Sequence, residues 1–319
     1  MSSLTRNEAA KWLRDHDNYL ILTHRRPDGD TIGTAAVLCR GLRQLGKHAH
    51  VLRNMEITEK YSHLHHGLNR DCPEAGDTLI AVDVAAPSLL PEAYSHLAKF
   101  VRLRIDHHGS DVPFAPLELV DPKAGACGEI VYDVLVQLGV VLDKPMAEAL
   151  YTAVSTDTGG FRYANTTAHT FRTAAACAEA GGDLHTINQQ IFDTNSFAKL
   201  RLQSWITKNV RFRCSGGVAV CALPAQVERE LGLTEDDLEN VSGFPRSIEG
   251  VKIAATLRET PDGSIKVSVR ALPGYDAAAV CAKFGGGGHK GAAGATVKAA
   301  LEEAAAMVSM EMEALFGEL

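Results

Sequence analysis

The chain has 319 residues, of which 45% are hydrophobic and 22% are charged; this is an ordinary globular balance that excludes a disordered chain and favours two domains over one. The formal net charge of −7 argues against a protein that tracks long duplex DNA or RNA, because such proteins usually carry a basic face. No apolar run approaches the ~20 residues of a transmembrane helix, and the N-terminus shows no signal-peptide pattern.

The seven cysteines are scattered, and no two of them form a C-x-x-C pair. This spacing argues against a disulfide framework or a thiolate zinc site, and it favours buried thiols in a reducing compartment. We therefore expect a cytoplasmic protein with no membrane partner.

The first half of the chain alternates short apolar runs with helical periodicity. Residues 19–23 predict a buried strand, and residues 32–45 show helical spacing that stops at Gly46. Further strands are expected at 49–52, 78–84 and 100–105, and helical segments at 128–160 and 167–179. Strands separated by helices indicate βαβ units and a mainly parallel sheet.

A long helix over 193–210, without turn signals, is expected to connect two domains. Beyond it, the sequence predicts a strand at 217–222, a hairpin formed by 251–257 and 265–272 around Pro261-Asp262-Gly263, and a terminal helix at 299–315. The expected fold is α/β, with an N-terminal parallel-sheet domain and flanking helices (1–190), a helical connector (191–208) and a smaller C-terminal α/β domain (209–319).

Four polar clusters follow predicted elements of the first domain. They are His24, Asp28 and Asp30 in H-R-R-P-D-G-D, Asp83 after Leu79-Ile80-Ala81-Val82, Asp106-His107-His108, and Asp157 in T-D-T-G-G. The carboxyl ends of neighbouring parallel strands converge on one crevice, where unpaired carboxylates would repel each other unless a cation compensates. Asp and His without Cys favour manganese, magnesium or iron over a structural zinc.

Each cluster also has a simpler explanation. Pro27-Asp28-Gly29 is ordinary turn chemistry, Asp83 could be a helix N-cap, Asp157 could cap a turn, and the two histidines could end a strand. The metal-site prediction depends on all four clusters occurring together. Asp83, alone at the end of its strand, is the candidate bridge between two ions held ~3.5–4 Å apart.

A glycine-rich tract near the C-terminus is the second candidate site. In Phe284-Gly285-Gly286-Gly287-Gly288-His289, the glycines could present several backbone N–H groups to an anion, although a flexible linker is the alternative. The tract lacks the Lys-Ser/Thr ending of an ATP-binding P-loop. Arg258 and Arg270 are candidate phosphate-binding residues, because arginine can contact a phosphate through two parallel hydrogen bonds. For Arg258, a solvated strand-end arginine is an equal alternative.

In combination these motifs resemble the DHH phosphoesterases. H-x-x-P-D-G-D, V-D, D-H-H and T-D-T-G occur in that family's order, and the glycine-rich tract followed by Ala292-Ala293-Gly294 resembles its C-terminal DHHA1 domain. The resemblance covers about residues 18–296. By size and spacing, the chain is most similar to the oligoribonuclease and pAp-phosphatase branch of the family.

The resemblance implies a hydrolase with two divalent metal ions, manganese being expected and magnesium or another divalent ion the alternative. It implies that His24, Asp28 and Asp83 bind one ion, and that Asp30, Asp83, His107 and Asp157 bind the other. It further implies that Asp106 orients a neighbouring imidazole and that His108 faces the substrate phosphate. Substrate contacts are expected from Gly286, Gly287, Gly288 and His289, and from Arg258 and Arg270.

The expected reaction is hydrolysis of short oligonucleotides to nucleoside monophosphates, or of pAp to AMP, by a hydroxide that bridges the two ions. The expected partners are short single-stranded RNA or DNA or mononucleotide bisphosphates. Hydrolysis of cyclic di-AMP or its linear product pApA at the same site is one alternative, and a non-catalytic nucleotide-binding regulatory protein is another. The oligomeric state is open, with a homodimer as one option.

Overall fold

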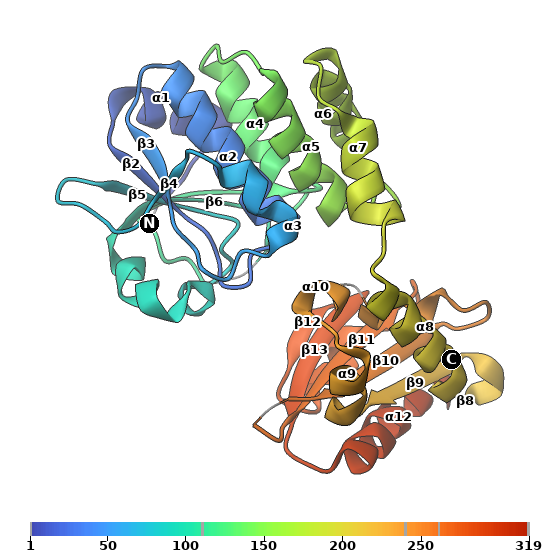
Figure 1. Ribbon diagram of the computed structural model, residues 1–319. Helices are drawn as coiled ribbons and strands as arrows, with labels where there is room; N and C mark the ends of the chain where they lie inside the picture. Colours follow the sequence, from blue (N-terminus) through green and yellow to red (C-terminus); the bar gives the residue numbers. More distant parts are fainter. Residues whose placement is uncertain (1, 110–111, 239–240, 261, 318–319) are drawn as a thin grey trace. The chain divides into compact units, whose positions relative to one another are not determined.

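The computed structural model describes residues 2–109, 112–238, 241–260 and 262–317. The chain forms two compact units, Met1–Thr194 and Asn195–Leu319, each with its own sheet and its own buried core (Figure 1). A larger unit on a parallel sheet, followed by a smaller mixed unit, confirms the predicted fold class.

The first unit is built on a seven-stranded sheet in which every pairing of neighbouring strands is parallel. The strand order is β1-β7-β6-β5-β2-β3-β4. In chain order the strands are β1 (Ser2–Ser3), β2 (Tyr19–Leu22), β3 (Ala49–Leu52), β4 (Asn69–Arg70), β5 (Thr78–Val82), β6 (Val101–Asp106) and β7 (Leu117–Val120).

The strand order reverses between β2 and β5. From β2 the chain moves outward through β3 to β4, returns to the other side of β2 at β5, and then moves outward through β6 to β7. In open α/β sheets, ligands bind outside the carboxyl ends of the strands at such a reversal. The topology therefore places the functional crevice after β2, β5 and β6.

Both faces of this sheet are covered, which explains why its central strands are apolar without alternation. One face packs against helices α1 (Arg6–Asp15), α2 (Gly29–Gln44), α4 (Cys127–Gln137) and α5 (Lys144–Asp157). The other face packs against the 3-10 segments η2 (Pro87–Leu89) and η3 (Glu92–Phe100). The unit also contains α3 (Glu59–Ser62), η1 (His63–His65), α6 (Ala168–Glu179), α7 (Leu184–Asn188) and the π-helical turn η4 (Gln189–Asp193).

Glycines allow α5 to approach α2 and α4 closely. A Cβ atom on Gly33 would lie 2.3 Å from the backbone oxygen of Ala149, and one on Gly128 would lie 2.9 Å from Cβ of Ala153. Real Cβ atoms do not tolerate such distances, so the close packing requires glycine. It fixes the first turn of α2, which carries Asp30.

The second unit is built on a six-stranded mixed sheet in the order β12-β13-β11-β10-β9-β8, in which only the β9–β10 pairing is parallel. Its strands are β8 (Arg211–Arg213), β9 (Val218–Leu223), β10 (Ile253–Glu259), β11 (Ile265–Ala271), β12 (Gly287–His289) and β13 (Ala292–Val297). Helices α11 (Ala277–Ala282) and α12 (Leu301–Gly317) pack on one face. The other face is covered by α8 (Phe197–Asn209), α9 (Ala225–Leu231) and α10 (Glu235–Leu238), together with the short turns η6 (Val241–Gly243) and η7 (Pro245–Ser247). A further short turn, η5 (Cys214–Gly216), joins β8 to β9.

The helix predicted as a separate connector belongs to the second unit. Leu202 and Ile206 of α8 are fully buried and pack against Cys221 and Leu223 of β9, and the boundary between the units falls after Thr194. The two buried residues lie four positions apart, the spacing of one helix face. The helix is therefore held by the second sheet rather than standing between domains.

Other differences from the expectations have local causes. Strand β7 was not predicted because it is short and contains Glu118, whose carboxylate lies beside the buried guanidinium of Arg104. The predicted hairpin is present as the antiparallel β10–β11 pair, and Pro261 of its turn lies outside the described residues. All seven cysteines are free; five are buried as expected, whereas Cys72 and Cys214 are exposed.

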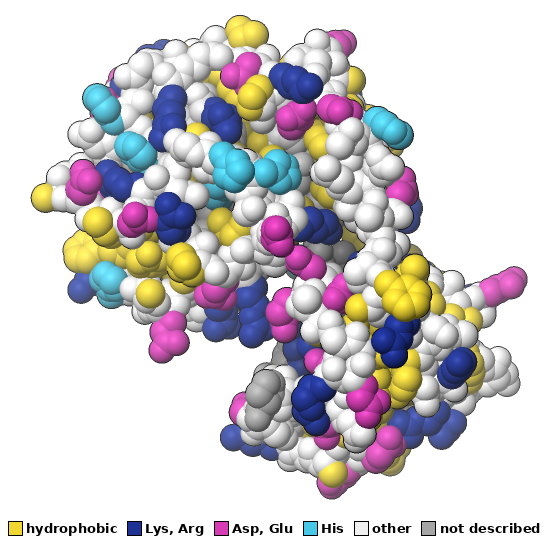
Figure 2. Space-filling view, in the orientation of Figure 1, with side chains coloured by type: hydrophobic (Ala, Val, Ile, Leu, Met, Phe, Trp, Pro, Cys, Tyr) yellow, Lys and Arg dark blue, Asp and Glu magenta, His cyan; other side chains and the backbone are white. Residues whose placement is uncertain are grey.

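Charged side chains of both signs are interspersed over the face of each unit shown in Figure 2, without a continuous basic surface there. Among the described residues, no helix has both the length and the apolar character needed to cross a bilayer.

Candidate metal centre

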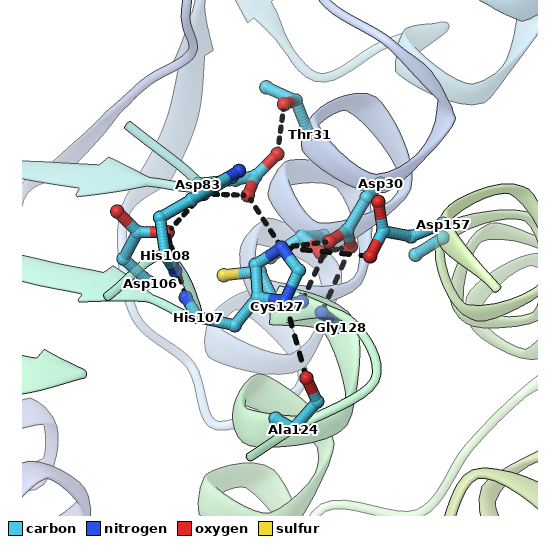
Figure 3. Close-up of polar contacts among 12 residues, drawn as sticks. Asp30, Thr31, Asp83, Asp106, His107, His108, Ala124, Cys127, Gly128 and Asp157 are labelled. Atoms are coloured by element: carbon cyan, nitrogen blue, oxygen red, sulfur yellow. Dashed lines mark hydrogen bonds and ion pairs between the residues drawn. The ribbon is translucent and has the colours of Figure 1, made fainter. Parts of the chain in front are cut away.

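The side chains predicted to bind metal lie together at the carboxyl ends of β2, β5 and β6 and at the near ends of α2 and α5. Figure 3 labels Asp30, Asp83, His107 and Asp157 among them. Two groups consist of predicted ligands alone, and within each the possible ligand atoms lie within 4.8 Å of one another: His24, Asp28 and Asp83 in one, and Asp30, His107 and Asp157 in the other. A third group with the same spacing contains His108 beside Asp83 and His107.

Asp83 joins the two groups. Its Oδ2 lies 3.7 Å from Nε2 of His24, and its Oδ1 lies 3.7 Å from Nε2 of His107. The side chain is 2% exposed, and Oδ2 accepts a hydrogen bond from the Thr31 hydroxyl. Oδ1 is buried and accepts no hydrogen bond. A buried carboxylate oxygen without a partner is unfavourable, so a cation at this position would satisfy it.

His107 faces three carboxylates. Its Nε2 lies 3.7 to 3.8 Å from an oxygen of each of Asp30, Asp83 and Asp157, and its Nδ1 lies 3.3 Å from the carbonyl oxygen of Ala124. That carbonyl accepts the ring proton, which leaves the lone pair of Nε2 directed at the carboxylates. Ligands that share one first-row ion lie ~3–4 Å apart, because each is ~2.1 Å from the metal. The observed spacing fits that requirement.

His24 has the same arrangement on the other side of Asp83. Its Nδ1 donates to the carbonyl oxygen of Arg25 at 2.7 Å, and its Nε2 lies 3.9 Å from Oδ1 of Asp28. Burial alone would lower the pKa of His24, but the neighbouring carboxylates of Asp83 and Asp28 outweigh it and raise that pKa to about 9. Asp28 is the N-cap of α2 and accepts from the backbone N–H of Thr31.

Asp30 is held by the N-terminus of α4. Its two carboxylate oxygens accept backbone hydrogen bonds from Cys127 at 2.7 Å and Gly128 at 3.0 Å. Burial and the charges of Asp83 and Asp157 nevertheless raise the pKa of Asp30 well above its ordinary value. Without a cation, the carboxylates at this site therefore compete for protons.

Asp157 ends α5, where the side chain of Asn165 supports it. The Nδ2 of Asn165 donates to Oδ2 of Asp157 at 3.3 Å, to its carbonyl oxygen at 3.2 Å, and to the carbonyl oxygen of Gly125 at 2.8 Å. Burial raises the pKa of Asp157 to about 6, with Asp28 and Asp83 adding to the rise and His107 opposing it.

Asp106, although part of the D-H-H motif, has no oxygen left for a metal. Its Oδ2 accepts two hydrogen bonds from Arg104, and its Oδ1 accepts from the backbone N–H groups of His107 and His108 and from Nδ1 of His108 at 2.8 Å. Asp106 thus orients His108. Burial alone would raise the pKa of Asp106, but His108 and Arg104 lower it to about 2.

His108 therefore differs from His107 in what it can do. Its Nδ1 also lies 3.5 Å from Oδ1 of Asp83, but Nδ1 carries the proton that bonds to Asp106 and is not a metal ligand. Burial would lower the pKa of His108, but the carboxylates of Asp106, Asp83 and Asp157 raise it to about 9. A protonated imidazole at this position can donate to a phosphate oxygen.

In the second unit, strand register brings Arg270 and His289 onto one face of the sheet. Arg270 of β11 and His289 of β12 both pair with Ala292 of β13, so the three residues form one row across adjacent strands, ~10 Å from end to end. The next row on this face is Ser268, Gly294 and Gly287. Arg270 and His289 thus lie on either side of a floor of small residues.

The glycine tract does not form the predicted anion-binding turn. Gly287–His289 is an edge strand instead. A Cβ on Gly286 would lie 2.2 Å from the oxygen of Gly294, and one on Gly288 would lie 2.6 Å from the oxygen of Ala292. These two glycines are therefore needed for close pairing with β13, whereas Gly287 leaves the outer face open.

Arg258 is engaged elsewhere. Its Nε and Nη2 donate to the two carboxylate oxygens of Glu228 at 2.8 and 3.2 Å. This two-point ion pair occupies one edge of the guanidinium, which favours the alternative of a structural arginine at a strand end. The role of Arg258 in substrate binding stays a prediction.

Sequence reasoning missed three supporting residues: Arg104, Thr31 and Asn165. Arg104 is completely buried and forms ion pairs with two carboxylates, those of Asp106 and of Glu118 on β7. An arginine two residues before an aspartate in an apolar strand places both on one face, and that spacing could have identified the pair. Nothing local distinguishes Thr31 or Asn165 from ordinary helix-cap and turn residues.

Two family models match the chain in the order expected from its motifs. The model described as the DHH family, N-terminal domain, matches residues 18–154, and the DHHA1 domain matches residues 216–314. Both matches fall within the two structural units described above.

Known proteins are similar over most of the chain. The bifunctional oligoribonuclease and PAP phosphatase NrnA of Thermus thermophilus is 35% identical over 286 residues, covering 87% of this chain and 83% of that protein. The protein of the same name from Bacillus subtilis is 25% identical over 298 residues, covering 92% and 93%.

Solved structures share the fold. An exopolyphosphatase-related protein from Bacteroides fragilis superimposes with a TM-score of 0.88 at 24% identity, covering 97% of this chain and 95% of that one. RecJ from Thermus thermophilus, in complex with Mn²⁺, gives a TM-score of 0.55 at 17% identity and covers 98% of this chain and 55% of its own. The domain order and the sequence relatives together establish that the chain belongs to the DHH family of phosphoesterases, a family of hydrolases, and carries a DHHA1 domain after its DHH domain.

Proposed function

We propose that this protein uses two divalent metal ions to hydrolyse short oligonucleotides to nucleoside monophosphates and pAp to AMP. The observation that carries the proposal is the meeting of the two ligand groups at Asp83, whose buried Oδ1 accepts no hydrogen bond. The substrate class is supported by the names of the relatives, among them the oligoribonuclease and PAP phosphatase that is 35% identical to this chain.

The donor atoms fit a pair of first-row divalent ions. One ion would be held by His24, Asp28 and Asp83, and the other by Asp30, Asp83, His107 and Asp157. Carboxylate oxygens with imidazole nitrogens and no thiolate favour Mn²⁺, with Mg²⁺ as the alternative. When bound, such ions act as Lewis acids on a phosphoryl group and activate water.

The side chains around the ligands would orient the substrate and supply a proton. His108, held by Asp106 and carrying a raised pKa of about 9, would donate to an oxygen of the scissile phosphate through its Nε2. No protein nucleophile is required.

In the second unit, Arg270 and His289 would contact a terminal phosphate or a base. In the row that they share, the small side chain of Ala292 separates them, which favours a ligand held between the two. Arg270 provides the charge, because a guanidinium can contact a phosphate through two parallel hydrogen bonds.

The test is product release from a panel of substrates. Full-length protein with Mn²⁺ is incubated with pAp, pApA, a five-nucleotide RNA and cyclic di-AMP, and nucleoside monophosphates are quantified. The proposal predicts AMP from pAp and pApA and stepwise shortening of the RNA. If cyclic di-AMP were the one substrate turned over, the protein would be a cyclic di-AMP phosphodiesterase instead. If it bound these ligands but turned over none of them, a regulatory role would be favoured.

A further inference from the structure

The turn that follows α5 has an unusual backbone. Gly159, Gly160 and Phe161 have φ values of +59°, +68° and +64°, three consecutive residues in the left-handed region that side chains other than glycine rarely adopt. Phe161 is held there because its N–H donates to the hydroxyl of Thr158 and its ring stacks at 5.4 Å on Phe171. Strained backbone of this kind concentrates at functional sites.

The turn returns to the metal centre. It begins directly after Asp157, and eight residues later Asn165 donates to both the carboxylate and the carbonyl of Asp157. The backbone N–H groups of Arg162 and Tyr163 both donate to the carbonyl oxygen of Thr158 at 3.0 Å. These bonds therefore fix the backbone of this turn relative to a proposed metal ligand.

Tyr163 presents one free face of its ring. A Cβ on Gly159 would lie 2.3 to 2.6 Å from the ring carbons Cζ, Cε1 and Cε2. Since three ring carbons and not the hydroxyl are nearest, the ring lies face-on over Gly159. The residue is 51% exposed, so about half of it remains accessible although one ring face lies over Gly159. An aromatic ring backed by protein on one side and open on the other is suited to stacking with a planar group.

Arg162 lies beside this ring in the sequence and is also held in place. Its Nε donates to the carbonyl oxygen of Gly159, and its guanidinium carbon lies 5.9 Å from the ring centroid of Phe192. Phe192 belongs to the π-helical turn η4, a rare conformation that is frequent at functional sites. Within the described residues, Arg162 forms no ion pair with a carboxylate, so its positive charge is not neutralised by the protein.

We propose that Tyr163 and Arg162 form a nucleotide platform next to the metal centre, in which the Tyr163 ring stacks on a nucleobase and Arg162 contacts a phosphate of the same ligand. The platform rests on the proposed function, because Tyr163 and Arg162 would be the residues that select a nucleotide over any other phosphate ester. A base stacked on one aromatic ring gains about 5- to 100-fold in affinity. Arg162 adds charge-assisted hydrogen bonds that do not depend on the base.

The experiment compares two ligands that differ only by the base. Binding of AMP and of ribose 5-phosphate to the full-length protein with Mn²⁺ is measured by calorimetry. Tyr163→Ala is expected to weaken AMP binding at least five-fold more than ribose 5-phosphate binding, whereas Tyr163→Phe keeps the wild-type preference. Arg162→Gln is expected to weaken both ligands to a similar degree, because both carry the phosphate.

Two further variants keep the test interpretable. Tyr163→Leu retains bulk over Gly159 without an aromatic ring and should behave like Tyr163→Ala. Phe100→Ala removes a ring of similar exposure, 54%, at the opposite end of β6 from His107, and should not alter the preference for AMP. Thermal melting of each variant verifies folding.

Equal weakening of AMP and ribose 5-phosphate by Tyr163→Ala and Tyr163→Leu, or no weakening of either, would overturn the platform. If the wild-type protein cleaves pApA but shows no such preference, only the platform fails. If it cleaves neither pApA nor pAp, the proposed function fails as well.

Discussion

Asp83 is a charged residue in a position that is unfavourable without a ligand. Its backbone has a φ of +56°, a left-handed conformation that is ~1–2 kcal/mol unfavourable for an L-residue. Its carboxylate is buried near Asp30, Asp157 and Asp28, whose negative charges repel one another. Both features are explained if the centre is built around cations and is destabilised when they are removed.

Asp83→Asn tests this explanation. Asparagine tolerates the left-handed backbone and removes one negative charge, so the metal-free variant should melt at a higher temperature than the metal-free wild type. The rise in melting temperature on adding Mn²⁺ should disappear, and hydrolysis should fall at least about 100-fold, since losses of 10- to 100-fold occur even for groups that only support a ligand.

The measurement is differential scanning fluorimetry in EDTA and in Mn²⁺, with a parallel assay on pApA. Asp71→Asn is the control, because the side chain of Asp71 is 77% exposed and forms an ion pair with Arg53 at the surface, away from the proposed metal ligands. An Asp83→Asn protein with wild-type Mn²⁺ stabilisation would contradict the bridging role.

The histidines predict how stability depends on pH in the metal-free protein. The pKa values of His24 and His108 are raised to about 9 by their carboxylate neighbours, above the ordinary ~6.5 of the unfolded chain. Their stabilising contribution is therefore complete below about pH 6.5 and is lost as the pH rises through about 9. The raised pKa of Asp157, about 6, also makes the free energy of unfolding fall as the pH rises, but at lower pH. Its contribution is complete below about pH 4 and is lost as the pH rises through about 6.

Urea denaturation in EDTA at pH 6.5, 8 and 9.5 should show a falling free energy of unfolding. His24→Gln should flatten this dependence, whereas His66→Gln, which changes an exposed histidine, should not. Mn²⁺ affinity should change in the opposite direction and increase over the same pH range, because a proton must leave His24 before it can bind a metal. A stability independent of pH in EDTA would argue against the charge arrangement described here.

At this scale, motif order and its resemblance to the DHH family were sufficient to propose the ligand residues, and three of the four polar clusters follow an apolar run. The supporting residues were harder to find. Arg104 could have been inferred from its spacing to Asp106, but its partner Glu118 lies on another strand. The side-chain orientation that makes His107 face the carboxylates and His108 face Asp106 is set by backbone contacts that sequence patterns do not contain.

Among the elements, α2 depends most clearly on its glycines. Gly33→Ala should destabilise the protein by about 1–3 kcal/mol, the usual cost of overpacking, although alanine in a helix interior would ordinarily stabilise it by about 1 kcal/mol. The reason is that the new methyl group would meet the backbone oxygen of Ala149 at 2.3 Å.

Gly41→Ala in the same helix is the matched control. Its methyl group would come closest to the Leu135 side chain, with Cδ2 at 2.6 Å and Cδ1 at 2.9 Å, and a side chain can shift more readily than the backbone oxygen opposite Gly33. Equilibrium urea denaturation distinguishes the two variants; equal free energies of unfolding would show that the α2–α5 contact is looser than described.

The two central strands of the second sheet, β10 and β11, lead to a prediction about substrate affinity. Arg270→Gln should raise KM for pApA about 10-fold or more, equivalent to ~1.4 kcal/mol, with a smaller effect on kcat. Arg258→Gln should change KM little and instead reduce stability by about 1–3 kcal/mol, because it leaves the carboxylate of Glu228 without its partner. Steady-state kinetics and denaturation of both variants separate these effects; a larger rise in KM for Arg258→Gln would reverse the assignment.

Helices and strands were predicted correctly where neighbouring residues determine them. The prediction failed where an element depends on contacts with residues far away in the sequence. The helix after residue 167 begins with a Thr167 cap, and strands β2, β3 and β5 are compact apolar runs. The glycine tract was expected to be a turn because glycine permits it, but its pairing with β13 depends on strand register across the sheet. For the same reason, α8 was assigned to a connector, since its packing partners on β9 lie beyond the helix in the sequence.

At the scale of the whole molecule, alternation of strands and helices predicted a parallel sheet with the metal site at its carboxyl edge. The strand order, with its reversal between β2 and β5, could not be read from the sequence, because it depends on which strands pair. That reversal explains why residues separated by more than 50 positions, such as His24 and Asp83, lie within 3.7 Å of each other.

The most direct test of the central claim is titration of metal-stripped protein with Mn²⁺ while AMP release from pApA is followed. The account predicts no release in EDTA and a return of activity that saturates after about two equivalents of tightly bound Mn²⁺, the number of ligand groups that meet at Asp83. Full activity in EDTA, or absence of activity at saturating Mn²⁺ and Mg²⁺, would contradict it.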